Sequence, residues 1–435
     1  MNNWPKTTIQ KSSYLKGRIG WQGLRASEFL EEGPFLITGT DFQHGKIDRS
    51  NCYHVSEERY NEASYIHVKD NDLLITKDGT IGKIALVEKC PSKAVLNSGI
   101  FLLRSKNASY DHNFAYYILT SEIFEKFLRL NLNGSTINHL YQYVFEKFEL
   151  PIPPPEVQQK IAGVLRTVDH AIASTEALIE KYQHIKAGLM HDLFTRGIGA
   201  DGKLRPPREQ APELYQESVI GWIPKEWIVH SLGELSDISS GVTLGSKRAL
   251  DQTINVTYLS VANVQDGYLD LHDIKEILVN RKTFENLLLK QGDVLMNEGG
   301  DFDKLGRGTV WQCEIEPCIH QNHVFRVRTD SQRLQPFFLA YWSQSIYGKR
   351  YFVLSSKQST NLASINSTQL KKFPIALPFL EEQREIEHRI DIANTKIDSL
   401  KKESRKLAYQ KNGLMHDLLT GKVPVTPDAT VISHS

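Results

Sequence analysis

The sequence predicts an α/β protein in which two homologous α/β domains are separated by two long helices. Three observations lead to this fold class: the hexapeptide GLMHDL occurs twice, a long proline-free stretch accompanies each copy, and both stretches carry apolar residues at heptad spacing. Two such helices in one chain can pair with each other as an antiparallel coiled coil, which gives the copies pseudo-twofold symmetry. A chain of 435 residues also exceeds one ordinary core, so more than one domain is expected.

The internal repeat is the clearest signal. GLMHDL stands at 188–193 and again at 413–418, an offset of 225 residues, and QQKI from Gln158 matches QREI from Gln383 at the same offset. This period is far beyond the roughly 20 to 50 residues of solenoid repeats, so it indicates a domain duplication. Further matches place Ala115-Tyr116 on Ala340-Tyr341 at offset 225, NDLLITKDG from Asn71 on GDVLMNEGG from Gly292 at offset 221, and Pro5-Lys6 on Pro224-Lys225 at offset 219. We interpret the growing offset as the result of loop insertions.

A proline-marked boundary precedes each long helix. The boundaries are LPIPPPE (150–156) and FPIALPFLEE (373–382), where prolines exclude an earlier helix and glutamates favour the first turn of the one that follows. We therefore expect helices over about 156–195 and 381–420. Each would be about 60 Å long at 1.5 Å per residue.

Each predicted helix carries an apolar seam with a period of 3.5 residues, which is typical of a coiled coil. Both seams have lysine at the same inner position (Lys186, Lys411), as expected if they descend from one element and meet each other. A long amphipathic helix could instead pack elsewhere or dimerise the chain, but the duplication favours pairing within the chain, with the domains at opposite ends of a rigid spacer. The first seam comprises Ile161, Val168, Thr175, Tyr182 and Leu189 with Leu165, Ile172, Ile179, Lys186 and Leu193; the second comprises Ile386, Ala393, Leu400, Leu407 and Leu414 with Ile390, Ile397, Ser404, Lys411 and Leu418.

These signals divide the chain into domains at 1–150 and 222–373, spacer helices at 151–196 and 374–420, and a linker at 197–221. The linker is polar and rich in proline and glycine, and the tail at 421–435 is expected to be disordered. A GxGxxG pattern at 197–202 follows a helix and precedes prolines, whereas a dinucleotide fingerprint follows a strand and opens a helix. We therefore interpret it as linker.

Composition excludes several classes of protein. No apolar run reaches the roughly 20 residues of a membrane span and the N-terminus lacks a secretory core, so a soluble cytoplasmic protein is expected. The four cysteines are too scattered for a disulfide framework. Cys313, Cys318, His320 and His323 have zinc-type side chains, but their spacing matches no familiar site, so no metal is expected.

The sequence shows no catalytic motif. It has no phosphate-binding GxxxxGK[ST], no HExxH and no strand-to-helix GxSxG. The His191-Asp192 and His416-Asp417 pairs resemble acid–base dyads, but adjacent helix residues do not face each other. A role near the C-terminus of a helix, where histidine is favourable, is the better interpretation.

Loops that mix basic, amide and hydroxyl residues are candidates for nucleic-acid contact, because phosphates take charge and base edges take arginine, asparagine and glutamine. With 52 basic and 51 acidic residues the chain has no global basic surface, so any such contact must be local. Each loop alone could be ordinary turn chemistry; recurrence in both copies favours the functional reading. The candidates are Lys16, Arg18, Trp21, Gln22, Arg25, Asn133, Ser135, Thr136 and Asn138 in the first copy, and Lys247, Arg248, His320, Gln321, His323, Lys357, Gln358 and Asn361 in the second.

Across essentially its whole length the chain resembles the specificity subunits of type I restriction-modification enzymes. The resemblance rests on LPIPPPEVQQKI with GLMHDLFT, on LPFLEEQREI with GLMHDLLTGKV, and on SVIGWIPKEW at the start of the second copy. It implies two target recognition domains that each read half of an asymmetric, interrupted site in double-stranded DNA. It also implies two methyltransferase subunits that carry S-adenosylmethionine and methylate adenine, and further subunits that translocate and cut DNA.

The resemblance implies that this chain is not itself an enzyme and binds no cofactor, which agrees with the lack of an Asn-Pro-Pro-Tyr-type methylation motif. Two alternatives stay open. A subunit of a type IIB-like or other fused restriction system would share the architecture, and its co-purifying subunits would differ. A coiled-coil scaffold without DNA binding would show no salt-dependent affinity for a duplex.

Overall fold

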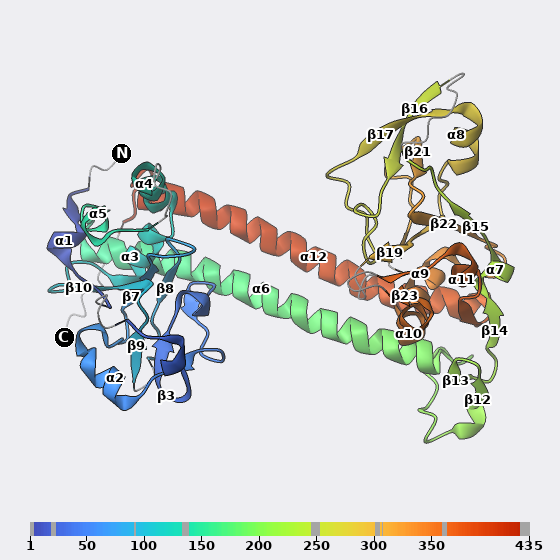
Figure 1. Cartoon of the computed structure of the whole chain (residues 1–435), viewed down its shortest axis with the longest axis horizontal. Coiled ribbons are helices and arrows are strands. Elements are labelled where there is room, and N and C mark those ends of the chain that lie inside the picture. The colour runs from blue at the N-terminus through green and yellow to red at the C-terminus, as the bar shows by residue number, and fades with distance from the viewer. Residues whose placement is uncertain are drawn as a thin grey trace, which may run out of the picture. The chain divides into compact units, whose positions relative to one another are not determined.

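The computed structural model describes residues 4–18, 23–90, 93–132, 139–244, 253–300, 305–306, 308–358 and 363–426. Contacts divide the chain into two compact units, the first formed by 1–176 with 401–435 and the second by 177–400. Each unit therefore holds one α/β domain and one end of each long helix (Figure 1). Within the described residues, none of the helices combines the length and apolar character that a bilayer crossing requires.

The first unit is built on a central sheet of order β2-β10-β7-β8 in which all neighbours are antiparallel. A second sheet, of order β6-β3-β9, contains a parallel pair between β3 and β9. These strands are β2 (Ser13–Gly17), β10 (Ile100–Ser105), β7 (Leu73–Thr76), β8 (Ile84–Leu86), β6 (Tyr53–His54), β3 (Leu30–Ile37) and β9 (Ala94–Leu96), and two small pairs are β1 (Lys6–Thr8) with β11 (Glu149–Pro151) and β4 (Phe42–Gln43) with β5 (Lys46–Ile47).

Helices of the first unit cover one face of its central sheet and enclose an aromatic core. Phe114, Phe124 and Phe145 are fully buried there. The start of the first long helix and the end of the second pack on the same core through Ile161, Leu165 and other apolar residues. The shorter helices are α1 (Ile9–Ser12), α2 (Glu57–Glu62), α3 (His112–Leu119), α4 (Glu122–Leu132) and α5 (Gln142–Phe145).

The second unit repeats this plan. Its central sheet has the order β15-β22-β18-β20 and its second sheet the order β17-β16-β21, again with one parallel pair, β16 with β21. The strands are β15 (Ser236–Ser240), β22 (Val324–Thr329), β18 (Val294–Asn297), β20 (Gly308–Val310), β17 (Lys275–Asn280), β16 (Thr253–Leu259), β21 (Cys318–His320), β14 (Ile228–Ser231) with β25 (Pro374–Leu377), β12 (Tyr215–Ser218) with β13 (Gly221–Pro224), and the set β19 (Gly299–Gly300), β24 (Ala363–Ser364) and β23 (Lys357–Gln358).

The helices of the second unit enclose a core that includes Trp227, Trp342 and Phe194, each with no exposed surface. Phe194 comes from the end of the first long helix, and burying such a side chain stabilises a fold by about 1.5–3 kcal/mol. The shorter helices are α7 (Leu232–Leu235), α8 (Arg281–Leu287), α9 (Pro336–Gln344), α10 (Ile346–Ser355) and α11 (Ser367–Lys371).

The two copies also share a buried ion pair across their central strands. Arg104 on β10 makes two 2.6 Å contacts with the carboxylate of Asp72, and Arg328 on β22 makes two 2.7 Å contacts with that of Asp293. Each aspartate side chain is only 1% exposed. A buried carboxylate needs such a bidentate partner, so this pair belongs to the inherited scaffold.

The structure corrects two of the predicted matches and the predicted steady growth of the offset. Lys6 pairs with Pro151 in the first copy, and Val229 pairs with Ala376 in the second. Lys6 therefore corresponds to Val229, at an offset of 223. The predicted match of Pro5-Lys6 to Pro224-Lys225 is wrong. The offset is 221 at β7 and β18, 224 at β10 and β22, and 225 in the long helices, so it does not grow steadily along the chain. The match of Ala115-Tyr116 to Ala340-Tyr341 is also wrong, because Tyr117 is the residue that occupies the place of Tyr341.

The long helices are α6 (Pro155–Arg196) and α12 (Leu380–Leu419), within two residues of the predicted bounds. None of the twenty heptad positions is exposed, whereas most positions between them are. In the first unit Lys411 Nζ lies 2.6 Å from Asp169 Oδ1, and in the second Lys396 Nζ lies 5.8 Å from the Tyr182 ring centroid. Each unit thus brings an early part of one helix against a late part of the other, which is an antiparallel arrangement.

A glutamine fastens each domain to the first turn of its long helix. Gln158 accepts a hydrogen bond from Asp111 N (2.8 Å) and donates to Pro153 O, and Gln383 does the same with Gln335 N (2.9 Å) and Pro378 O. Both glutamine side chains are buried. The angle at which each domain meets its helix is therefore set by the same buried contact in both copies.

A tyrosine makes a second contact of this kind. Tyr117 OH donates to Asp169 Oδ2 (2.7 Å) on α6, and Tyr341 OH donates to Asp391 Oδ1 (2.5 Å) on α12. Burial raises the pKa of both phenols, so they remain neutral donors. Tyr117 and Tyr341 are 224 residues apart, as are Asp111 and Gln335, so the tyrosines correspond although Asp169 and Asp391 stand at different positions on their helices.

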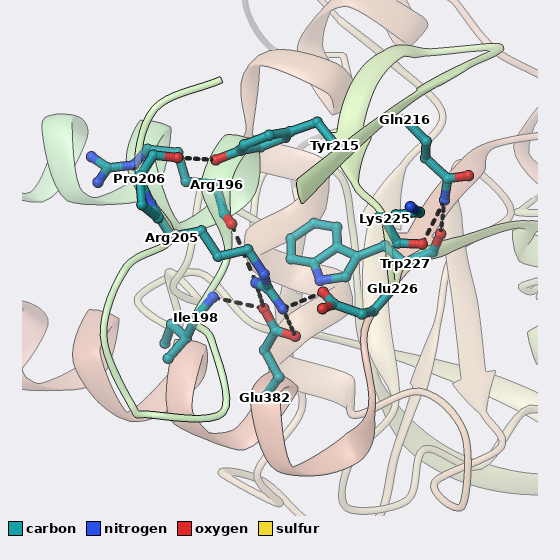
Figure 2. Close-up of polar contacts among 10 residues, drawn as sticks. All are labelled: Arg196, Ile198, Arg205, Pro206, Tyr215, Gln216, Lys225, Glu226, Trp227 and Glu382. Atoms are coloured by element: carbon teal, nitrogen blue, oxygen red, sulfur yellow. Dashed lines mark hydrogen bonds and ion pairs between the residues drawn. The ribbon is translucent and has the colours of Figure 1, made fainter. Parts of the chain in front are cut away.

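The segment after α6 is packed, although its composition predicts a linker. Gly197 has φ +62°, and a side chain there would collide with Glu382 and Trp227. Figure 2 shows Arg205 between two carboxylates: its guanidinium is 2.6 Å from Glu382 Oε1 and 2.7 Å from Glu226 Oε2. Glu382 Oε1 also accepts from Ile198 N (2.7 Å). The glycines of the GxGxxG pattern thus serve a turn that joins α6 to the start of α12.

Candidate nucleic-acid interface

In the second unit, several of the segments predicted to contact nucleic acid meet at one end of the central sheet. Val242 N, just after β15, donates to His320 O (2.8 Å), and Glu298 N, just after β18, donates to His323 O (3.0 Å). β19 follows Glu298 and pairs with β24, which pairs with β23. We call this place edge 2; it comprises residues 242–244, 298–300, 320–323, 357–358 and 363–365.

Edge 2 presents imidazole and amide groups to solvent. The His323 side chain is 56% exposed, and its Nδ1 lies 2.6 Å from Glu298 Oε2. Gln321 and Asn322 beside it are half-buried. Lys357 and Gln358 lie in β23, paired with Ser364 and Ala363. Amide and imidazole groups can donate to and accept from base edges.

His320 is not on the surface, and the expectation that it contacts a ligand directly is corrected. Its side chain is completely buried, with Nδ1 2.7 Å from Val324 O. Burial lowers the pKa of His320 to about 4, so the ring is neutral and Nδ1 donates to that carbonyl. Cys318 beside it is buried, and burial raises the pKa of its thiol to about 12. Among the described residues, no cluster of three or more His, Cys, Asp or Glu side chains is placed to hold a metal ion.

The first unit has an equivalent place, which we call edge 1; it comprises residues 16–18, 77–79, 97–99 and 139–141. Lys77 N, after β7, donates to Gly99 O, and Leu140 N donates to Lys77 O, both at 2.9 Å. The second contact has its counterpart in the second unit, where Ile365 N donates to Glu298 O (2.8 Å). The two edges therefore occupy the same position in the fold but carry different residues.

Arg18 is a second correction. Its side chain is 4% exposed and its Nε donates to Leu96 O (2.9 Å), so it supports β9 from inside the domain. Burial lowers the pKa of this guanidinium. Lys16 on β2 and Arg25 beside a 3-10 turn are exposed, as expected of residues that meet a ligand. The other predicted contacts lie outside the described residues: Trp21, Gln22, Asn133, Ser135, Thr136, Asn138, Lys247, Arg248 and Asn361.

Sequence reasoning missed an aromatic group next to edge 1. Tyr141 is 50% exposed and Tyr143 is 61% exposed, and their ring centroids are 5.6 Å apart. His139 meets Tyr141 edge-on at 4.7 Å and hydrogen-bonds to Asp78. The signal was available as YQY in LYQYVFEK, directly after the predicted loop NLNGSTINH. Because it resembles the apolar pattern of a short core helix, the pattern alone does not indicate that these rings are exposed.

The two His-Asp pairs do not form dyads. Asp192 lies 3.5 Å from Arg196 Nη1 and Asp417 lies 3.4 Å from Lys422 Nζ. His191 and His416 are exposed on the last turns of α6 and α12. Asp192 therefore pairs with Arg196 one helical turn later, and Asp417 pairs with Lys422, which follows the end of α12.

The structure defines a class of protein with two copies of one α/β domain. Each domain is fastened to the start of its own long helix, and each unit's core also includes the end of the other long helix. A family model described as type I restriction modification DNA specificity domain matches residues 24–183 and 224–409. The chain belongs to this family.

Relatives in the family match most of the chain. The MjaVIII specificity subunit of Methanocaldococcus jannaschii, a type I restriction enzyme subunit, is 30% identical over 368 residues, covering 83% of this chain and 81% of that protein. The EcoKI specificity subunit of Escherichia coli K12 is 22% identical over 422 residues, covering 96% of this chain and 87% of that protein. The family match at 24–183 and 224–409 includes most of both copies of the repeat and most of both long helices.

Two solved structures share the fold. A chain from a study of complex assembly and conformational transition of the type I R-M system matches with a TM-score of 0.59 and 15% identity, covering 97% of this chain and 99% of that one. The type I restriction-modification S subunit of M. genitalium matches with a TM-score of 0.55 and 17% identity, covering 96% and 97%. At these identities the comparison establishes the fold alone.

Proposed function

We propose that the chain is the DNA-reading subunit of a type I restriction-modification complex and that each α/β domain reads one half of an asymmetric, interrupted site. The observation that carries the proposal is the pair of equivalent edges, where the same scaffold supports loops of different sequence. Edge 1 offers Lys77, Asp78 and His139 where edge 2 offers Glu298, Gly299 and Ser364. Two unlike edges on one scaffold suit a site whose halves differ.

Binding at these edges combines positioning by phosphate contacts with reading by base contacts. The near-equal totals of basic and acidic residues mean that attraction to DNA is local to the edges and their flanking loops. The exposed Lys16 and Arg25 supply charge in the first unit, and Gln321, Asn322 and His323 supply groups that match base edges in the second.

The long helices act as a ruler between the half-sites. Gln158 and Gln383 fix each domain on the first turn of its helix, so the length of the helical pair determines how far apart the two edges stand. Sequence preference then includes the number of unread base pairs between the halves. This makes the spacer itself a determinant of specificity.

The partners in this proposal are double-stranded DNA, two methyltransferase subunits that carry S-adenosylmethionine and methylate adenine, and restriction subunits that translocate and cut. The chain binds no cofactor and performs no chemistry of its own. Support comes from the naming of the relatives as specificity subunits and from the solved type I complex that includes a chain of this fold.

A footprint with a salt titration tests the proposal. The chain co-purified with its methyltransferase partner should protect two short patches of DNA separated by an unprotected gap. Its affinity should fall steeply with salt, because bound phosphates release counterions. One uninterrupted patch, or an affinity that does not respond to salt, would contradict the proposal. The subunits that co-purify distinguish a type I complex from a type IIB-like one.

A further inference from the structure

The aromatic cluster of the first unit, formed by His139, Tyr141 and Tyr143, is a second feature of edge 1. The tyrosine rings lie within 29° of parallel at 5.6 Å, and the His139 ring stands edge-on to Tyr141. The hydrogen bond from His139 to Asp78 ties the cluster to the end of β7. The cluster is therefore a built surface whose first ring is held by the central sheet.

Neither tyrosine contributes much to the core. Leu140 and Phe145 on either side are completely buried and Phe148 is 3% exposed, so these neighbours supply the packing. Within the part of the chain that the structure describes, neither tyrosine hydroxyl makes a hydrogen bond. Two adjacent rings that are half exposed and lie beside edge 1 are available to contact a ligand.

One lysine lies over a ring of the cluster, and a second lysine follows β7 at edge 1. Lys147 Nζ is 5.9 Å from the centroid of the Tyr143 ring, and Lys77, whose carbonyl accepts from Leu140 N, has its Nζ 5.0 Å from the Phe101 ring. The carboxylate of Asp78 is engaged by His139, and that of Glu146 accepts a hydrogen bond from Gln142. Aromatic faces beside lysines are the combination that binds bases of unpaired strands.

The second unit keeps the scaffold of this segment but not its rings. Leu140 and Ile365 make the same backbone contact, and Phe148 and Phe373 are both buried, which fixes the offset at 225. At that offset Ser364, Asn366 and Thr368 stand where the first unit has His139, Tyr141 and Tyr143. The cluster is therefore a difference between the two edges and not part of their common core.

We propose that His139, Tyr141 and Tyr143 form a stacking platform for a base left exposed at an opened step in the half-site of the first unit. The inference rests on the proposed function, because it assigns residues to the DNA surface of edge 1. Methyltransferases act on bases extruded from the helix, which leaves an opened step whose faces can stack on protein. Tyrosine rings accept any base face, so the platform adds affinity at an opened step.

The test uses the complex of the full chain with its methyltransferase partner and a duplex that carries the mapped site. Replacing both rings in Y141A/Y143A should weaken DNA binding by roughly tenfold or more, since losing a stacking ring typically has that effect. The salt dependence of affinity should stay unchanged, because no phosphate contact is removed. Y141F/Y143F should bind within about twofold of the parent chain. 2-Aminopurine placed in the first half-site should report less stacking in the alanine variant only.

Tyr14 provides the matched control. It lies in the same unit, is 51% exposed and has Lys106 Nζ 5.3 Å from its ring, but it stands at the far end of β2 from edge 1. Y14A should bind DNA like the parent chain. An unchanged affinity of Y141A/Y143A, or an equal loss in Y14A, overturns the inference.

Two further outcomes separate the possible failures. One is that sedimentation of Y141A/Y143A shows less complex with the methyltransferase partner, while the complex that still forms binds DNA with the parent affinity. In that case the cluster is a protein-docking surface and the inference is overturned. If the parent complex itself shows no salt-dependent binding to the duplex, the proposed function fails, and the inference fails with it.

Discussion

The packed turn after α6 gives a sharp prediction, because two carboxylates share one arginine but differ in burial. The side chains of Arg205 and Glu382 are 8% and 10% exposed, whereas that of Glu226 is 52% exposed. In Glu382→Gln the amide keeps one acceptor oxygen but points a donor at Arg205 Nη2, which lies 3.2 Å from Glu382 Oε2. The charge of a nearly buried guanidinium is then balanced by the solvent-exposed carboxylate of Glu226 and no longer by Glu382.

The expected cost follows from these contacts. Removing one partner of a fully buried ion pair costs about 3–5 kcal/mol, and a hydrogen bond to a charged group is worth about 1.5–3 kcal/mol. Because Glu226 still pairs with Arg205, we expect a loss of about 2–3 kcal/mol in the local opening free energy. In Glu226→Gln we expect a loss under about 1 kcal/mol, as for other exposed pairs.

Native-state hydrogen exchange followed by mass spectrometry measures this directly. Peptides that span 196–227 should exchange about 30- to 150-fold faster in E382Q, since about 1.4 kcal/mol corresponds to a factor of ten. In E226Q their exchange should change less than about fivefold. Equal acceleration in the two variants, or none in E382Q, would refute the reasoning from burial.

Three further predictions concern the spacer, the domains and pH. Removing one heptad between Ala173 and Ala187, with the matching heptad of α12, should shorten the gap in the recognised site by about 10 Å, or roughly three base pairs. Methylation mapping that shows the original gap would contradict the proposal that the helices set its length. Replacing residues 1–150 with the corresponding domain of a relative should alter only one half of the methylated sequence, and a change in both halves would argue against independent domains. Burial raises the pKa of Glu387 to about 7, above its ordinary value of 4.5, so the native state holds a proton that the unfolded state releases. The stability that protonated Glu387 contributes is complete below pH 4.5 and is lost as pH rises to about 7. In Glu387→Gln, the free energy of unfolding measured with urea should not show this loss between pH 4.5 and 7. The same pH dependence in the variant and the parent chain would contradict the prediction.

The features that sequence could predict are those with a long repeat. The heptads of α6 and α12 extend over many turns, so the periodicity identifies the helices and their inward positions despite polar members such as Lys411. The duplication was visible for the same reason, since GLMHDL lies where both helices pack on a domain. Short strands carry no such redundancy, so a two-residue identity such as Pro5-Lys6 with Pro224-Lys225 points to the wrong segment.

Individual site residues were less predictable, because exposure depends on contacts between segments far apart in the sequence. Arg18 and His320 sit in polar loops, yet the backbone carbonyls of Leu96 and Val324 accept their hydrogen bonds and draw both side chains inside. Tyr141 and Tyr143 resemble core residues and are exposed, because Leu140 and Phe145 already fill the interior. Polarity alone therefore misplaces residues of both kinds.

Sequencing of methylated adenines in DNA exposed to the chain and its methyltransferase partner tests the central claim most directly. Two unlike half-sites with a fixed gap between them, methylated only when the chain is present, is the result that the account predicts. An uninterrupted methylated motif, or the same methylation from the partner without the chain, would contradict it.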